Sequence, residues 1–254
     1  MNLLLAGLMG LASICAQDAQ TFHQKLFDVQ NRLALENAGG LANGGVCWWH
    51  SRFQRAAWAL TVFDPTQPKP DSNHARALIR TIINRNTVVV IPGYDDLESF
   101  TAENRNLIQV ELEQWQLRDG FLNQAWIRGI SGRSSLPARA LKSQMDAIYS
   151  RFIAATANQD VLWLLLQIKG IVSHASLLVG MTPAENGGYH LEVVDSNVPQ
   201  GVVTYDYRNG DTSLTPDSPL GYENSFSMVP YLGYDQDLTR IHRALRNYCH
   251  SFAR

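Results

Sequence analysis

The sequence predicts an α+β protein with a mostly helical N-terminal half and a mostly β C-terminal half. Two observations lead to this class. Apolar residues recur at three- and four-residue spacing in most segments before residue 158, and four short apolar runs follow between residues 161 and 208. With 254 residues, 45% of them hydrophobic, the chain is long enough for one large domain or two closely packed lobes with a sizeable core.

The helical half begins with an amphipathic pattern over residues 21–38, which Gly39 and Gly40 end. A second helical pattern starts at Cys47, and Pro and Gly signals predict a loop over residues 64–73. Further helices are predicted over residues 75–85, 101–120, 137–158 and 234–252, with a short buried strand or apolar run over residues 87–94.

The β half consists of the runs 161–168, 174–181, 189–197 and 201–208. Strands this close in sequence favour antiparallel neighbours, because no crossover helix separates them. Asn209-Gly210 is a strong hairpin signal after the last run.

An uncharged apolar run at the N-terminus, Leu3 to Ala16, has the length of a secretory signal sequence. It predicts a signal peptide over residues 1–16, a mature domain over residues 17–254, and a secreted or periplasmic location. The alternative is a buried N-terminal helix. Cys15 would leave with the leader, and a Cys47–Cys249 bridge stays open as a rival to any thiol chemistry at Cys47.

Net charge and hydropathy limit the classes of partner that the chain is expected to have. The net charge of −2 gives no electrostatic footprint for nucleic acid. No interior run is apolar enough to cross a bilayer, so no membrane span is expected in the mature chain. The histidines lack ligand-like clustering, and neither a metal nor another cofactor is expected.

Cys47 is a candidate nucleophile because it stands at a predicted helix start, after the flexible pair Gly44-Gly45. Unpaired N–H groups at a helix start favour a thiolate. The alternative is an inert cysteine packed among aromatic residues. His50 is one turn along the same helix and is poorly placed to serve as its base.

His174 is a better candidate base, because it opens a predicted strand. The next strand ends at Asp195, and antiparallel pairing returns that end to His174. A carboxylate or amide there could orient the imidazole. Asp195 is favoured over Asn197 for this role, although Asp and Asn also commonly begin turns.

These segments resemble the papain-like cysteine peptidases. "GGVCW" is similar to the family's nucleophile motif, "SHASLLVGM" to its histidine strand, and "LEVVDSN" to the strand carrying its orienting residue. The resemblance implies a helical lobe packed against a twisted antiparallel β lobe, with Cys47, His174 and Asp195 as the catalytic triad. Leu41 occupies the place of the family's oxyanion glutamine, and Asn43 is the nearest amide that could replace it.

The resemblance implies hydrolysis of a peptide or protein substrate through a thioester acyl-enzyme. Two alternatives stay open. A transglutaminase-like acyl transferase uses the same triad order, and an exported binding protein could keep this fold without catalysis. Substrate specificity and oligomeric state are not marked by any motif.

Overall fold

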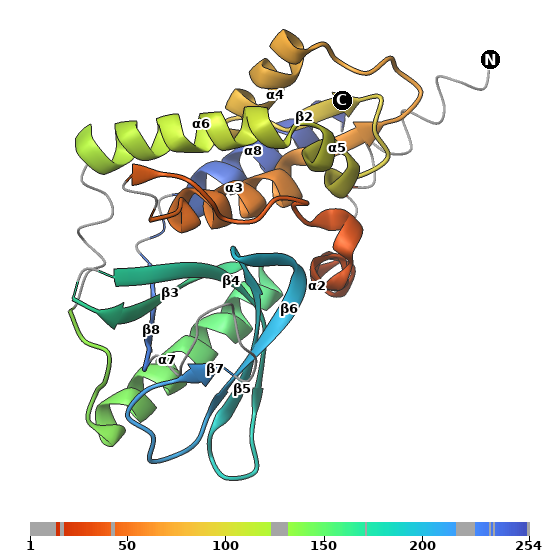
Figure 1. Cartoon of the computed structure of the whole chain (residues 1–254). Helices are drawn as coiled ribbons and strands as arrows, with labels where there is room; N and C mark the ends of the chain where they lie inside the picture. Colours follow the sequence, from red (N-terminus) through yellow and green to blue (C-terminus); the bar gives the residue numbers. More distant parts are fainter. Residues whose placement is uncertain are drawn as a thin grey trace.

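The computed structural model describes residues 14–15, 18–41, 44–122, 132–170, 172–216, 227–233, 235 and 237–252. The chain forms a helical lobe and a β lobe, and helix α3 (Cys47–Leu60) lies where the two meet (Figure 1). The mixed α and β architecture with an antiparallel sheet confirms the coarse prediction from the sequence.

The helical lobe surrounds α3. Asp71 and Asp96 start two of its helices, because each carboxylate accepts a hydrogen bond from a first-turn backbone N–H group. The other elements of this lobe are β1 (Thr61–Asp64), α4 (Ser72–Asn84), β2 (Val89–Pro92), α5 (Leu97–Glu103), α6 (Arg105–Leu117), the π-helical turn η3 (Arg118–Leu122) and α8 (Asp237–Phe252).

The β lobe is a six-stranded sheet with the order β7-β6-β5-β4-β3-β8. The five strand pairings of this sheet are all antiparallel, as the close spacing of the runs predicted. Its members are β3 (Leu162–Lys169), β4 (Val172–Pro183), β5 (Tyr189–Asp195), β6 (Val198–Tyr207), β7 (Thr215–Pro216) and β8 (Val229–Leu232). Helix α7 (Ala138–Ala157) packs against this sheet (Figure 1).

Alternation along β3 divides the core between the two faces of the sheet. Trp163 and Leu165 belong to a cluster with α3, whereas Leu164 and Leu166 pack with α7. The sheet is therefore buried on both faces, and α3 is fixed against one of them. This packing sets the position of the N-terminal end of α3 relative to β4 and β5.

Three details differ from the sequence-based expectations. The first helix, α2 (Ala19–Phe27), ends well before Gly39, because the Asp28 carboxylate caps the short 3-10 turn η1 (Val29–Asn31). The helix expected over 101–120 is two helices, α5 and α6, separated at Asn104. Strand β1, which pairs in parallel with β2, was missed because its apolar residues continue the pattern of α3 without a break.

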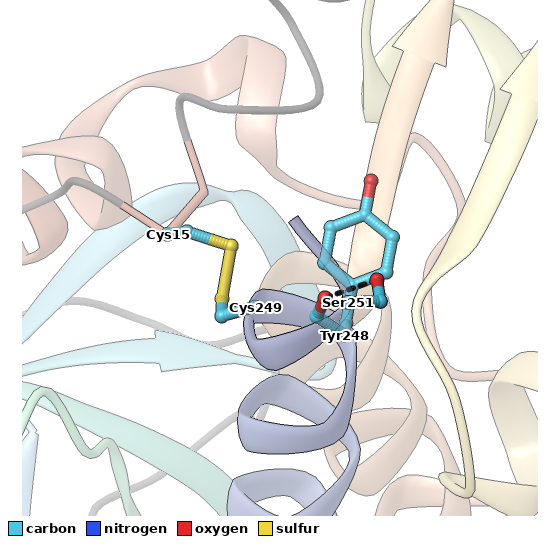
Figure 2. The surroundings of a disulfide bond; sticks show 4 residues. All are labelled: Cys15, Tyr248, Cys249 and Ser251. Atoms are coloured by element: carbon cyan, nitrogen blue, oxygen red, sulfur yellow. Dashed lines mark hydrogen bonds between the residues drawn. A yellow bond between two sulfur atoms is a disulfide. The ribbon is translucent and has the colours of Figure 1, made fainter. Parts of the chain in front are cut away.

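The cysteine pairing also differs from the open alternative. Cys249 forms a disulfide with Cys15, so the rival Cys47–Cys249 bridge is wrong (Figure 2). Cys47 is free. Ile14 packs beside the cluster that joins α3 to α8, whereas residues 1–13 and 16 of the predicted leader lie outside the described residues. Within the described part of the chain, no helix is long and apolar enough for a membrane crossing.

Candidate active site

Cys47 is the first residue of α3, as predicted, and the backbone before it is tightly constrained. Gly45 has φ +81°, a left-handed conformation that side chains disfavour. A Cβ atom on Gly45 would lie 2.6 Å from Nδ2 of Asn37. Glycine is therefore required here for both its conformation and its lack of a side chain, as its place before a candidate nucleophile suggested.

The N-terminal end of α3 offers donors to a ligand. The residue that precedes the helix is Val46, and no side-chain cap is found there among the described residues. First-turn N–H groups of an uncapped helix, that of Cys47 included, favour negative charge nearby. The Cys47 sulfur lies 3.9 Å from the carbonyl oxygen of Ser173, at the beginning of β4. Cys47 therefore faces the β lobe across the junction of the two lobes.

His174 and Asp195 meet in the way that the antiparallel turn predicted. Ser176 on β4 is opposite Asp195 on β5, and His174 is two residues earlier on the same face. The Nε2 atom of His174 lies 2.8 Å from both carboxylate oxygens of Asp195. Because Asp195 engages Nε2, Nδ1 is the ring nitrogen left for the Cys47 sulfur, which is close enough to hydrogen-bond the imidazole.

The charges of these groups reinforce one another. Burial lowers the pKa of His174, but the charge and hydrogen bond of Asp195, together with Cys47, outweigh burial and raise this pKa well above its ordinary value. Burial raises the pKa of Asp195, yet the opposite charge of His174 and the hydrogen bonds leave it below its ordinary value. The arrangement favours an imidazolium held between a carboxylate and a sulfur.

Asp195 is fully buried and surrounded by donors. Besides His174, it accepts hydrogen bonds from the Ser176 hydroxyl and the Tyr205 hydroxyl, each at 3.3 Å, and from the backbone N–H of Asn197 at 2.8 Å. A buried carboxylate with all these partners is fixed in position and stays ionised. Ser176 and Tyr205 were not singled out from the sequence, because their apolar strand contexts carry no signal of this role.

Asn197 has a different role from Asp195. Its side-chain oxygen accepts a hydrogen bond from Nδ2 of Asn37 at 2.9 Å, and the backbone N–H of Asn37 donates to the carbonyl of Ser196 at 2.7 Å. Asn37 in turn accepts from the backbone N–H of Val46. This clasp ties the approach to Cys47 to the turn after Asp195. The other amide considered, Asn43, lies outside the described residues.

His50 makes an informative contrast with His174, since both imidazoles are buried. Nε2 of His50 lies 2.7 Å from the carbonyl oxygen of Leu35, so this nitrogen carries the proton and donates. Burial lowers the pKa of His50 to about 4, with only weaker opposing contributions. His50 is therefore neutral and holds the segment before Asn37, as its unsuitable position on α3 had indicated.

The two tryptophans after Cys47 are buried, as expected for residues that pack the lobe interface. Trp48 makes an edge-to-face contact with Trp163 of β3, with ring centroids 4.7 Å apart. Among the described residues, no cluster of three His, Cys, Asp or Glu side chains has a geometry suited to a metal ion.

Comparison of the chain with family models, with curated proteins and with solved structures finds no match. The function is therefore argued from the chemistry of the site itself.

Proposed function

We propose that this protein is a cysteine peptidase of papain-like architecture. One observation carries the proposal: a free thiol at a helix start, supplied by one lobe, faces a His174–Asp195 pair supplied by the other. A thiolate beside an imidazolium is the form in which cysteine is an effective nucleophile near neutral pH.

The reaction follows from the positions of these groups. The Cys47 thiolate attacks the carbonyl carbon of a peptide bond, and the backbone N–H of Cys47 is a donor for the oxyanion that forms. His174 then donates its proton to the leaving amine as the C–N bond breaks, which leaves a thioester on Cys47. Water, deprotonated by His174, hydrolyses this thioester. Asp195 holds the imidazole in orientation throughout.

The same proposal includes export through an N-terminal leader that ends before Cys15, not after residue 16. The Cys15–Cys249 disulfide supports export, because disulfides form and persist in oxidising compartments such as the periplasm and the extracellular space. The thiol of Cys47, in contrast, stays free and available for chemistry.

Alkylation of the chain by iodoacetamide across pH, with the modified residue located by mass spectrometry, tests the proposal without a known substrate. We expect rapid labelling of Cys47 at acidic to neutral pH, well below the value of about 8.5 typical of a free thiol. Since the pKa of His174 is raised, the imidazolium persists above pH 6.5, and the labelling stays fast through that range. His174→Ala should move the rapid phase to higher pH.

The matched control is His190→Ala, which removes an exposed histidine that is also paired with an aspartate, Asp206. It should leave the labelling profile unchanged. Cys47→Ala should abolish both labelling at this position and hydrolysis of fluorescent casein. Labelling that rises only near pH 8.5 and does not respond to His174→Ala would falsify the proposal. Incorporation of an amine into a glutamine substrate, without hydrolysis, would instead indicate the acyl-transferase chemistry.

A further inference from the structure

A cavity of about 1330 Å³ opens between the lobes beside the candidate active site. Trp48, which follows Cys47, is one of its walls, and Tyr231 on β8 is another. Burial raises the pKa of Tyr231, and the nearby charge of Cys47 adds to this effect, so the phenol is close to the reactive sulfur. The end of the cavity at Trp48 and Tyr231 is therefore its end nearest to Cys47.

The cavity is unusual in its charge. The arginines that line it are Arg52, Arg85, Arg118, Arg151 and Arg240. The carboxylates that line it are Asp119, Asp235 and Asp237, which leaves five positive against three negative charges. Asp235 is also used by a sixth arginine, Arg55, which is fully buried beneath the cavity. The lining of the cavity therefore carries more positive than negative charge.

Arg85 is the clearest sign that something is to be bound. Arg85 is only 5% exposed, and its Nε atom lies 3.3 Å from a carboxylate oxygen of Asp237. Its Nη1 atom is buried with no hydrogen-bond partner among the described residues. An unpaired buried donor on a cation is costly, and an anion that reached Nη1 from the cavity that Arg85 lines would satisfy it.

The setting of Arg85 shows that this orientation is built into the fold. Arg85 ends α4 in the left-handed conformation, with φ 56°. Its guanidinium lies 4.7 Å from the ring centroid of Trp115, and that of Arg52 lies 4.6 Å from the same ring. Burial lowers the pKa of Arg85 to about 10, so it remains cationic at neutral pH. The contact with the Trp115 ring and the ion pair with Asp237 hold the guanidinium in place at the wall of the cavity.

We propose that this cavity is a substrate subsite that binds a carboxylate of an acidic peptide, through Arg85, while the peptide bond is presented to Cys47. The inference rests on the proposed peptidase function. A peptide fits better than a free inorganic anion for two reasons. The volume far exceeds that of one small anion, and the walls near Cys47 include the aromatic rings of Trp48, Trp163 and Tyr231, which suit the apolar parts of a peptide.

The experiment uses internally quenched peptides in which Glu or Gln is placed in turn at each position on both sides of the cleaved bond. At one position we expect the native chain to prefer Glu by about 10- to 100-fold in kcat/KM, the range for a charge-assisted hydrogen bond. Arg85→Met should remove most of this preference, and Arg85→Lys should restore part of it. Asp237 keeps Arg52 as a partner in both variants, so we expect them to fold.

The matched control is Arg80→Met, which removes an exposed arginine from the same helix and should keep the preference for Glu. No preference for Glu at any position, with His174-dependent labelling of Cys47 intact, would overturn the subsite and leave the proposed function standing. If that labelling is absent, peptide binding at the subsite is measured instead by the change in Tm on addition of Glu or Gln peptides. A Glu-specific, Arg85-dependent rise in Tm would then support it. No rise, or an Arg85-dependent rise with inorganic phosphate alone, would overturn it.

Discussion

The two halves of α3 are held in different ways. Around its first residue, Cys47, the contacts to the β lobe are hydrogen bonds made by Asn37 and a buried His174–Asp195 pair. Around its middle, Arg52 and Arg55 are held by ion pairs to Asp235 and Asp237, at the beginning of α8. The first half contacts the sheet alone in this way, whereas the middle is tied both to the β lobe, through Trp163, and to α8 of its own lobe.

The buried charged groups near these two halves also differ in whether their hydrogen-bonding atoms have partners. Asp195 has four donors around it, including a doubly contacted imidazole. Arg85, which ends α4 and shares Asp237 with Arg52 of the other half, keeps a buried N–H group without an acceptor among the described residues. A fully satisfied carboxylate is suited to holding a neighbour in place, whereas an unsatisfied cation is suited to binding something that arrives. The first half therefore performs the chemistry in our proposal, and the second selects the substrate.

The largest effect is expected from Asp195. Asp195→Ala should lower the rate of casein hydrolysis by about 10³- to 10⁴-fold, as loss of the orienting carboxylate does in related triads. It also removes one acceptor each from His174, Ser176 and Tyr205, so stability has to be followed by thermal melting. Asp195→Asn, which keeps the shape, separates the loss of charge from a loss of fold.

The control for this prediction is Asn197→Ala. Asn197 contacts Asn37, whereas Asp195 contacts His174, so this variant should reduce the rate much less. Full activity of a folded Asp195→Ala, with activity lost in Asn197→Ala, would reverse the assignment of the orienting residue.

A smaller effect, on the same half of α3, is expected from Gly45→Ala. The left-handed backbone alone should cost about 1–3 kcal/mol of unfolding free energy. The methyl group would also displace the amide of Asn37 and loosen the clasp that positions Cys47. We therefore expect a lower Tm and slower alkylation of Cys47 at pH 6.

Gly187→Ala provides the comparison for Gly45→Ala. Gly187 has φ +74°, but a Cβ atom there would have no neighbour nearer than 3.9 Å. Gly187→Ala has the unfavourable left-handed backbone but no steric overlap of the new methyl group. Its Tm should therefore fall less than that of Gly45→Ala, and the alkylation rate of Cys47 should stay native. Equal effects of the two variants would show that the clasp by Asn37 contributes nothing to the reactivity of Cys47.

The sequence was most informative where local patterns are strong. The run from Cys47 to Leu60 and the four apolar runs after residue 161 became α3 and strands β3 to β6. Apolar periodicity did not predict helix ends that are set by a single polar side chain. Asp28 ends α2 by capping the next turn, which a periodicity of apolar residues does not reveal.

For the candidate site, the neighbours in a hairpin could be predicted and the contacts between lobes could not. Asp195 returns to His174 because β4 and β5 are adjacent in sequence. Asn37 and Arg85 depend on contacts between distant segments, and neither stands in a recognisable motif. The N–H of Arg85 that has no acceptor among the described residues is visible only from its burial and its neighbours in the fold.

The smallest effect on reactivity is expected from the disulfide at the far end of α8 (Figure 2). Cys249→Ser should lower the unfolding free energy by about 2–4 kcal/mol, the usual contribution of such a bond. The Arg52–Asp237 ion pair still holds the beginning of α8, and Ile241 and Ala244 still pack with Leu60 of α3. Alkylation of Cys47 at pH 6 should therefore stay within about twofold of the native rate, because its own contacts are unchanged.

The same bond sharpens the prediction for export. Cleavage after residue 16 would remove Cys15, so that boundary and the disulfide cannot both hold in one mature chain. The small residues Gly10 and Ala12 allow cleavage before Ser13, which keeps Cys15. We expect the N-terminal sequence of the secreted product to begin between Ser13 and Cys15. Cys15→Ser should then lower Tm as much as Cys249→Ser, and the double variant should fall no further, because each change breaks the same bond. A product that begins after Cys15, with Cys249 labelled as a free thiol, would contradict this pairing and restore the boundary at residue 16.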